Sequence, residues 1–275
     1  MADTDILYDV SQRIATVTLN RPDRLNAYTA SLGDQLRAAM RRATDDPGVR
    51  VIILTGAGRG FCAGADMDNL AAGTASGGAT LAAENPKALP PPFDPASSPD
   101  YQTVHSYFPA VPKPIIAAIN GACAGLGLVY ALYCDQRFAA AGAKFTTAFA
   151  RRGLIAEHGI SWMLPRLVGP TNALDLLCSA RTVMTEEAAT IGLVKALPGR
   201  DFLEAVQGIA RSLTIDASPR SIGAIKRLVW DGFFQDLDQA WRQADEAMVR
   251  SFASEDFKEG VAHFIEKRAP RFTGR

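Results

Sequence analysis

The sequence predicts an α/β fold, and three observations lead to this expectation. An alternating strand pattern at 14–19 is followed by a helix pattern and then by a continuous apolar run at 51–54. A strand that opens into a glycine-rich turn occurs twice, at 51–60 and at 114–127. Strand patterns stop near residue 200, and helix patterns fill the rest of the chain. We therefore expect an α/β core at 1–200 and a helical region at 201–275.

The first unit has the order strand, helix, strand, which is typical of a parallel sheet. Residues 14–19 alternate between apolar and polar and are rich in β-branched side chains. A helix is expected at about 29–43, with Ser31 as a suitable N-cap, and an Asp-Pro-Gly sequence ends it. The apolar run at 51–54 is typical of a strand buried on both faces.

The stretch at about 70–100 differs in composition from the rest of the chain. It is rich in Ala, Gly, Pro and Ser and has little apolar periodicity. We expect a long loop there and no core element. It is either a tolerated surface insertion or a lid-like cover over a site, and both alternatives stay open. A short helix is expected at 101–110.

The second half of the core repeats the pattern of strand, glycine turn and helix. A strand at 114–119 leads into a turn at Gly125, Leu126 and Gly127 and then into a helix at about 128–134. Strands at 135–140 and 143–146 and a polar loop at 151–159 follow. Further helices are expected at 160–169, 171–179, 185–191, 201–214, 218–230, 236–251 and 254–268, with a short strand at 194–197.

Composition and charge exclude several classes of function. The chain is 48% hydrophobic and 21% charged, as in an ordinary soluble globular protein. Lys+Arg and Asp+Glu number 29 each, so the net charge indicates neither a nucleic-acid nor a membrane partner. The first residues lack the basic region of a secretory signal, and no apolar run approaches the ~20 residues of a membrane span. Four scattered cysteines predict free thiols in a reducing cytoplasm, and no metal site is expected.

The two glycine-rich turns are the candidate site. Glycines and other small residues let backbone N–H groups approach a ligand closely. N–H groups that face a reacting carbonyl form an oxyanion hole, and a helix N-terminus favours the developing negative charge. We therefore expect the turns at 56–67 and 119–127 to converge on one carbonyl oxygen.

Several segments carry a family resemblance when they are taken in order. They are Leu-Asn-Arg-Pro at 19–22, Gly-Phe-Cys-Ala-Gly-Ala-Asp-Met at 60–67, Lys-Pro-Ile-Ile-Ala-Ala-Ile-Asn-Gly at 113–121, Gly-Leu-Gly at 125–127 and Leu-Pro-Arg-Leu-Val-Gly at 164–169. This ordered set resembles the crotonase superfamily, also called the enoyl-CoA hydratase/isomerase family. The resemblance implies a crotonase-like spiral of ββα units with a helical C-terminal trimerisation region. It also implies a homotrimer or a dimer of trimers.

The resemblance further implies an acyl-CoA substrate, with no cofactor apart from the coenzyme A of the substrate. By matching position, the N–H groups of Ala65 and Leu126 would bind the thioester oxygen. Phe264 and Lys267 match residues that hold the nucleotide end, often from a neighbouring subunit. The other residues that it implies for binding substrate or coenzyme A are Arg24, Leu25, Ala27, Ala63, Asp66 and Met67.

The sequence departs from the family pattern at two positions. Typical hydratases use two glutamates, and the matching residues here are Val129 and Phe149, neither of which can carry a proton. Glu157 remains as a carboxylate, and some Δ3,Δ2-enoyl-CoA isomerases look similar in having a single glutamate. Glu157 is therefore the leading candidate for the acid/base, although it could instead pair with a nearby arginine. His158 is a candidate second acid/base, and Asp100, Tyr101 and His105 are weaker candidates.

These observations predict a cytoplasmic acyl-CoA enzyme that acts on 2- or 3-enoyl-CoA in fatty-acid or related acyl-CoA metabolism. Hydration is the commonest activity that the family implies, while isomerisation fits the residues better. One alternative is hydrolysis, decarboxylation or C–C cleavage of a CoA thioester. Another is a catalytically inactive acyl-CoA binder. No nucleic-acid or membrane partner is expected.

Overall fold

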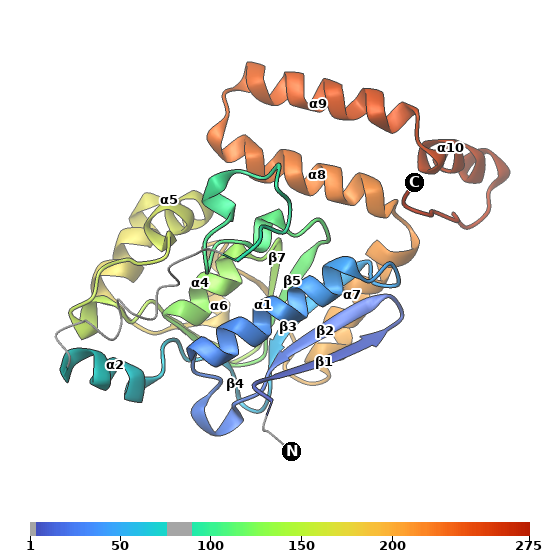
Figure 1. Ribbon diagram of the computed structural model, residues 1–275. Coiled ribbons are helices and arrows are strands. Elements are labelled where there is room, and N and C mark those ends of the chain that lie inside the picture. Colours follow the sequence, from blue (N-terminus) through green and yellow to red (C-terminus); the bar gives the residue numbers. More distant parts are fainter. Residues whose placement is uncertain (1–3, 76–89) are drawn as a thin grey trace.

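The computed structural model describes residues 4–75 and 90–275 and has the expected α/β architecture (Figure 1). Its larger sheet has six strands in the order β1-β2-β3-β5-β7-β10. The pair β1 and β2 is antiparallel, and the other neighbours are parallel. The strands are β1 (Ile6–Ser11), β2 (Ile14–Leu19), β3 (Val51–Gly56), β5 (Ile115–Ile119), β7 (Gln136–Ala140) and β10 (Lys195–Leu197).

A second sheet of four short strands, which the sequence patterns did not reveal as a sheet, lies beside the first. Its order is β4-β6-β8-β9, with β4 (Gly60–Cys62), β6 (Ala122–Ala124), β8 (Lys144–Thr146) and β9 (Val183–Met184). Strands β4 and β6 follow β3 and β5 directly, and a helix follows each of them. The chain therefore repeats a ββα unit. Glycine and alanine occupy much of β4 and β6, so these strands lack the β-branched pattern that marks a strand in a sequence.

The helices agree with most of the expected ranges. Four of them follow residue 200, and of these α9 and α10 lie at the outer edge of the molecule (Figure 1). Within residues 4–75 and 90–275, no helix is long and apolar enough to cross a membrane. The α-helices are α1 (Ala30–Asp45), α2 (Met67–Ala75), α4 (Leu126–Tyr133), α5 (Ile160–Ser179), α6 (Thr185–Thr190), α7 (Phe202–Ile215), α8 (Pro219–Asp231), α9 (Leu237–Phe252) and α10 (Glu255–Glu266), and the 3-10 turns are η1 (Pro22–Arg24), η2 (Pro99–Tyr101), η3 (Phe108–Ala110), η4 (Ala150–Arg152) and η5 (Gly232–Phe234).

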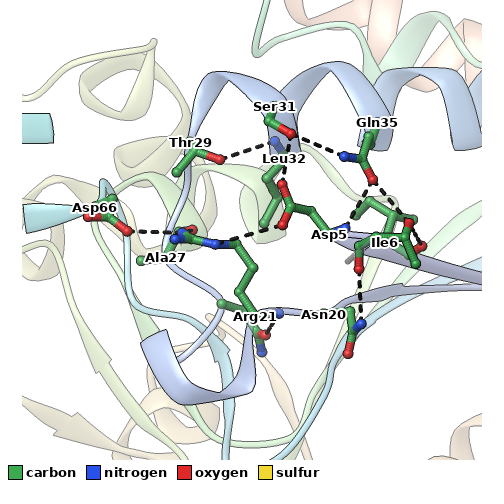
Figure 2. Close-up of polar contacts among 12 residues, drawn as sticks. Asp5, Ile6, Asn20, Arg21, Ala27, Thr29, Ser31, Leu32, Gln35 and Asp66 are labelled. Carbon is green, nitrogen blue, oxygen red and sulfur yellow. Dashed lines mark hydrogen bonds and ion pairs between the residues drawn. The ribbon is translucent and has the colours of Figure 1, made fainter. Parts of the chain in front are cut away.

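The N-cap of helix α1 lies two residues before the predicted one. Thr29 is the N-cap, and its hydroxyl accepts a hydrogen bond from the Leu32 amide at 3.2 Å. The Ser31 hydroxyl instead donates to the Asp5 carboxylate at 2.9 Å (Figure 2). The prediction of Ser31 as the cap was wrong because a tertiary partner, Asp5, binds its side chain.

One further expectation about helices needs correction. The helix predicted at 101–110 is absent, and two single 3-10 turns, η2 and η3, lie in this region. A proline near the start of each turn favours a short turn over a continuous helix. The helices predicted at 160–169 and 171–179 make up α5, and the break between them lies at Gly169, as expected, where the backbone is non-helical with a φ of 78°.

The stretch at 70–100 is partly core, contrary to expectation. It begins inside α2, and Phe93 is buried in the main hydrophobic cluster with a relative exposure of 8%. The Phe93 ring stacks on Tyr107 at 5.1 Å, and the Arg41 guanidinium lies over it at 4.1 Å. Because the surrounding sequence is rich in alanine and proline, it gave no sign that Phe93 is buried in the core. The rest of the predicted lid, at 76–89, lies outside the described residues.

A buried ion pair attaches α8 to the core. The Lys226 ammonium lies 2.8 Å from the Asp135 carboxylate, and it donates to the carbonyl oxygens of Phe108 and Lys113. Trp230 on the same helix donates to the other Asp135 oxygen at 2.7 Å. These bonds hold α8 against β5 and η3.

All four cysteines are free, as expected.

We expect Lys226→Met to lower the free energy of unfolding by ~3–5 kcal/mol, because it leaves the buried Asp135 carboxylate without its cation. Lys144→Met, at an exposed position of strand β8, is the matched control and should change it by less than ~0.5 kcal/mol. Urea denaturation of the three proteins measures both values. Equal effects of the two substitutions would contradict the role given to the buried pair.

Candidate active site

Two glycine turns from different ββα units touch each other. Gly64 follows β4 with a φ of 93°, and Gly125 precedes α4 with a φ of 49°. A Cβ on Gly64 would lie 2.9 Å from the carbonyl oxygen of Ala124 and 3.6 Å from the Gly125 Cα. Any side chain at Gly64 would therefore push the turns apart. Glycine at both positions allows the approach and the positive φ values.

The residues that follow these glycines present backbone amides at the point of contact. Ala65 forms an isolated parallel bridge with Tyr28, in which the Gly64 carbonyl and the Asp66 amide make the hydrogen bonds. The N–H of Ala65 itself faces away from that bridge. Leu126 is the first residue of α4, so its N–H has no partner within the helix. Among the described residues, neither amide has a hydrogen-bond acceptor in the protein.

Ala65 and Leu126 both line one cavity of about 270 Å³. Glu157 and His158 line the same cavity, so four of the predicted catalytic residues lie together. Phe149 is also part of its wall, whereas Val129 is buried inside α4. The remaining wall includes Tyr28, Ala30, Asn69, Leu70, Val104, His105, Arg152 and Leu154.

Glu157 and His158 form a close pair in the loop before α5. The Glu157 carboxylate lies 3.2 Å from His158 Nε2, and both side chains are about one-third exposed. Burial lowers the pKa of His158, and the neighbouring Glu157 carboxylate offsets only part of that shift. Glu157 was also a candidate for an ion pair with an arginine. Within the described residues, its ion-pair partner is instead His158.

The backbone of this loop is held by α4. The Tyr133 hydroxyl donates to the His158 carbonyl at 3.0 Å. His158 and Gly159 both have left-handed φ values, 55° and 79°. A left-handed non-glycine residue costs free energy and is often found at functional sites. The bond from Tyr133 therefore helps to fix the position from which Glu157 and His158 enter the cavity.

His105 is a weaker candidate in the sequence, but in the structure it lies in the wall of the cavity. Its Nδ1 lies 2.9 Å from the Tyr130 hydroxyl, and its ring packs edge-on against His158 at 4.4 Å. Burial, together with the charge of His158, lowers the pKa of His105 to about 3. The imidazole is therefore neutral near pH 7. His105 is not part of a sequence motif. Its contact with His158, which only the structure shows, is what makes it a candidate site residue.

Asp66 supports the turn and does not line the cavity. The Arg21 guanidinium donates to its carboxylate at 3.0 Å and to the Ala27 carbonyl at 2.6 Å (Figure 2). Burial acts to raise the pKa of Asp66, but the hydrogen bonds and charge of Arg21, with the Asp68 amide, make the net shift downward. Asp66 is thus an ionised anchor that joins the turn after β4 to η1.

The other residues predicted to bind coenzyme A fall into two groups. Leu25 and Ala63 are joined by a backbone hydrogen bond of 3.0 Å, beside Ala27 and the exposed Arg24 and Met67. This group adjoins the Ala65 turn. Phe264 and Lys267 instead lie at the end of α10, far from α2 in Figure 1, so a single chain does not bring them to the cavity. In the described ranges, no three potential ligands cluster around a metal position.

The sequence of the chain matches a family of known proteins. Residues 9–275 match the family model described as Enoyl-CoA hydratase/isomerase. The chain belongs to this family.

Members of the enoyl-CoA hydratase/isomerase family are similar along the whole chain. A protein of Rhodobacter capsulatus named "Probable enoyl-CoA hydratase" is 36% identical over 98% of each chain. The 1,2-epoxyphenylacetyl-CoA isomerase of Escherichia coli is 32% identical over 98% of each. The solved enoyl-CoA hydratase of Bacillus anthracis superposes with a TM-score of 0.87 at 27% identity, covering 98% of this chain and 100% of that one. The fold is thus the crotonase fold, and the chain is an enzyme of the hydratase/isomerase family.

We expect His105→Phe to flatten the dependence of stability on pH. The unfolded chain binds a proton at His105 with the ordinary pKa of 6.5, but the folded chain binds it only near 3. Stability from the neutral ring is therefore full above pH 6.5 and is lost as the pH falls, by up to ~1.4 kcal/mol per pH unit. Urea denaturation between about pH 7 and 5 measures the slope. Identical slopes for the two proteins would contradict the burial of a neutral His105.

Proposed function

We propose that this enzyme stabilises the enolate of an acyl-CoA thioester between the amides of Ala65 and Leu126, with Glu157 as the acid/base. The observation that carries the proposal is that Ala65, Leu126 and Glu157 line one cavity, while the amides of Ala65 and Leu126 have no acceptor among the described residues. Aimed N–H donors in a site with little water stabilise a developing oxyanion strongly. Coenzyme A enters as part of the substrate, and proton transfer requires no further cofactor.

The reaction best supported is movement of a double bond from position 3 to position 2 of an enoyl-CoA. The Glu157 carboxylate removes a proton from carbon 2, and the C–H electron pair becomes part of the enolate. The negative charge on the thioester oxygen is bound by the two amides. Glu157 then returns its proton to carbon 4, which leaves the double bond between carbons 2 and 3. One carboxylate is sufficient because no water is consumed.

Hydration of a 2-enoyl-CoA is the second candidate, and the pair of Glu157 and His158 favours it. Val129 and Phe149 stand where typical hydratases have glutamates, so the usual two-glutamate activation of water is lacking. Two acid/base groups 3.2 Å apart could nevertheless divide the work. One would accept the proton of the attacking water and pass it to the other, which would deliver it to carbon 2. The lowered pKa of His158 keeps a neutral, basic imidazole available at neutral pH.

The exposed apolar residues of the C-terminal helices support a homotrimer or a dimer of trimers. A monomer rarely exposes so many large apolar side chains on adjacent helices. Phe264 is 81% exposed at the end of α10, and in an assembly it and Lys267 would bind the nucleotide end of the CoA in a neighbouring chain. The exposed set on α9 and α10 is Leu237, Trp241, Met248, Val249, Phe252, Phe257, Val261, Phe264 and Ile265.

We expect Glu157→Gln to lower turnover by ~100-fold or more, because the amide cannot accept the proton. Double-bond migration in 3-enoyl-CoA and hydration of 2-enoyl-CoA, over several chain lengths, are the assays. Glu204→Gln, on α7 outside the cavity, is the matched control and should retain activity. Migration without hydration would support the isomerase. Full activity of Glu157→Gln on either substrate would refute the assignment of the base.

The amide of Leu126 can be removed by proline, because proline is tolerated at the first position of a helix. We expect Leu126→Pro to lower kcat by ~10²–10³-fold through loss of one oxyanion donor. Leu126→Ala keeps the N–H while also losing the leucine side chain, so it should retain far more activity. Thermal melting of both variants checks the fold. Equal losses in the two variants would show that the amide has no special role.

A further inference from the structure

A second cavity adjoins the candidate active-site cavity. It has a volume of about 420 Å³, compared with about 270 Å³ for the first. His105 and His158 line both cavities, so the two histidines form the boundary between them.

Aromatic rings from four separate elements make up much of the second cavity. They are Tyr101 of η2, Tyr133 of α4, Trp162 of α5 and Phe234 of η5. Trp162 and Phe234 are stacked with centroids 5.0 Å apart, and Tyr101 meets Phe234 edge-on at 5.6 Å.

Contacts behind these rings hold them in place. The Arg166 guanidinium lies 3.9 Å above the Trp162 ring, and the Tyr101 hydroxyl donates to the Trp230 carbonyl at 2.9 Å. The cavity thus offers fixed ring faces and edges to a guest. Aromatic guests prefer such surfaces because offset-stacked and edge-to-face contacts add to the free energy of burial.

Several polar groups of the second cavity are already hydrogen-bonded within the protein. The Tyr133 hydroxyl donates to the His158 carbonyl, and the Ser106 hydroxyl donates to the Asp100 carbonyl. Thr103 bonds to Ser106 at 2.6 Å. A guest that brought its own hydroxyl or amide groups would have to break these bonds or leave groups unpaired, which costs free energy. The cavity therefore favours a guest that is bound by ring packing.

We propose that the acyl group of the substrate carries an aromatic ring, which binds in the second cavity beyond His105 and His158. This inference rests on the proposed function, because it needs a CoA thioester at Ala65 and Leu126. The two histidines lie at the boundary between the two cavities. Their neutral rings admit an apolar group, and their separation of 4.4 Å leaves no room for it between them, so the acyl group passes beside the pair. Trp162 and Phe234 then form the stacked wall that receives the ring.

Saturated thioesters test the proposal without turnover, because they can be neither hydrated nor isomerised. The probes are butanoyl-CoA, octanoyl-CoA and 4-phenylbutanoyl-CoA, the last two being similar in length. Calorimetry on the full chain gives each Kd. We expect 4-phenylbutanoyl-CoA to bind ~10-fold more tightly than octanoyl-CoA, in line with stacking of one additional ring. Equal or tighter binding of octanoyl-CoA would overturn the aromatic assignment.

Trp162→Leu is the diagnostic variant, and Leu174→Ala is its control on the same helix. Leu174 is 61% exposed and lines neither cavity. We expect Trp162→Leu to reduce the preference for 4-phenylbutanoyl-CoA over octanoyl-CoA to less than ~2-fold, with a much smaller effect on butanoyl-CoA. Leu174→Ala should keep the full preference.

The pattern of failure separates the two proposals. If butanoyl-CoA binds but no aromatic preference appears, the aromatic assignment is wrong and the proposed function stands. If none of the three thioesters binds, the proposed function itself is wrong, and the aromatic assignment fails with it. A preference that survives in Trp162→Leu would also overturn the assignment of the second cavity.

Discussion

The candidate site depends on the contact between the turns at Gly64 and Gly125. These turns belong to different ββα units, and they meet because Gly64 has no Cβ, which would lie 2.9 Å from the Ala124 carbonyl oxygen. Neighbouring positions are equally restricted, since a Cβ on Gly127 would lie 2.3 Å from the Cys62 carbonyl oxygen. Asn120 adds hydrogen bonds to the carbonyls of Gly56 and Gly58 that fix the turn after β3. Two amides can therefore face one cavity without any side chain between them.

The surroundings of these amides bear on the chemistry that they can support. His105 is held neutral by burial, burial likewise lowers the pKa of His158, and the wall beside them includes Phe149 and Leu154. Glu157 is the carboxylate that lines this cavity within the described residues. Hydrogen bonds to a developing oxyanion are stronger in such surroundings than in water. In the proposed mechanism, one base beside two oxyanion donors transfers a proton and does not need to activate water.

The two cavities divide the proposed work between different parts of the chain. The turns of the ββα units supply the oxyanion donors, and the loop before α5 supplies the base. The ring-lined cavity is assembled from η2, α4, α5 and η5, which come from both the core and the helical C-terminal region. Lys226 and Asp135 hold that region against the core, so the buried ion pair also maintains the wall that contains Phe234.

The sequence by itself determined the features that depend on neighbouring residues. The apolar run of β3, the helices after residue 200 and the ordered motifs were readable, because periodicity and turn chemistry act over a few residues. The motifs also identified Ala65, Leu126 and the absence of glutamate at Val129 and Phe149. Only the tertiary structure decided that Glu157 lies in one cavity with the two amides, that His158 is its partner and that His105 is buried and neutral. Proximity and burial arise from packing among residues far apart in the chain, and no local pattern records them.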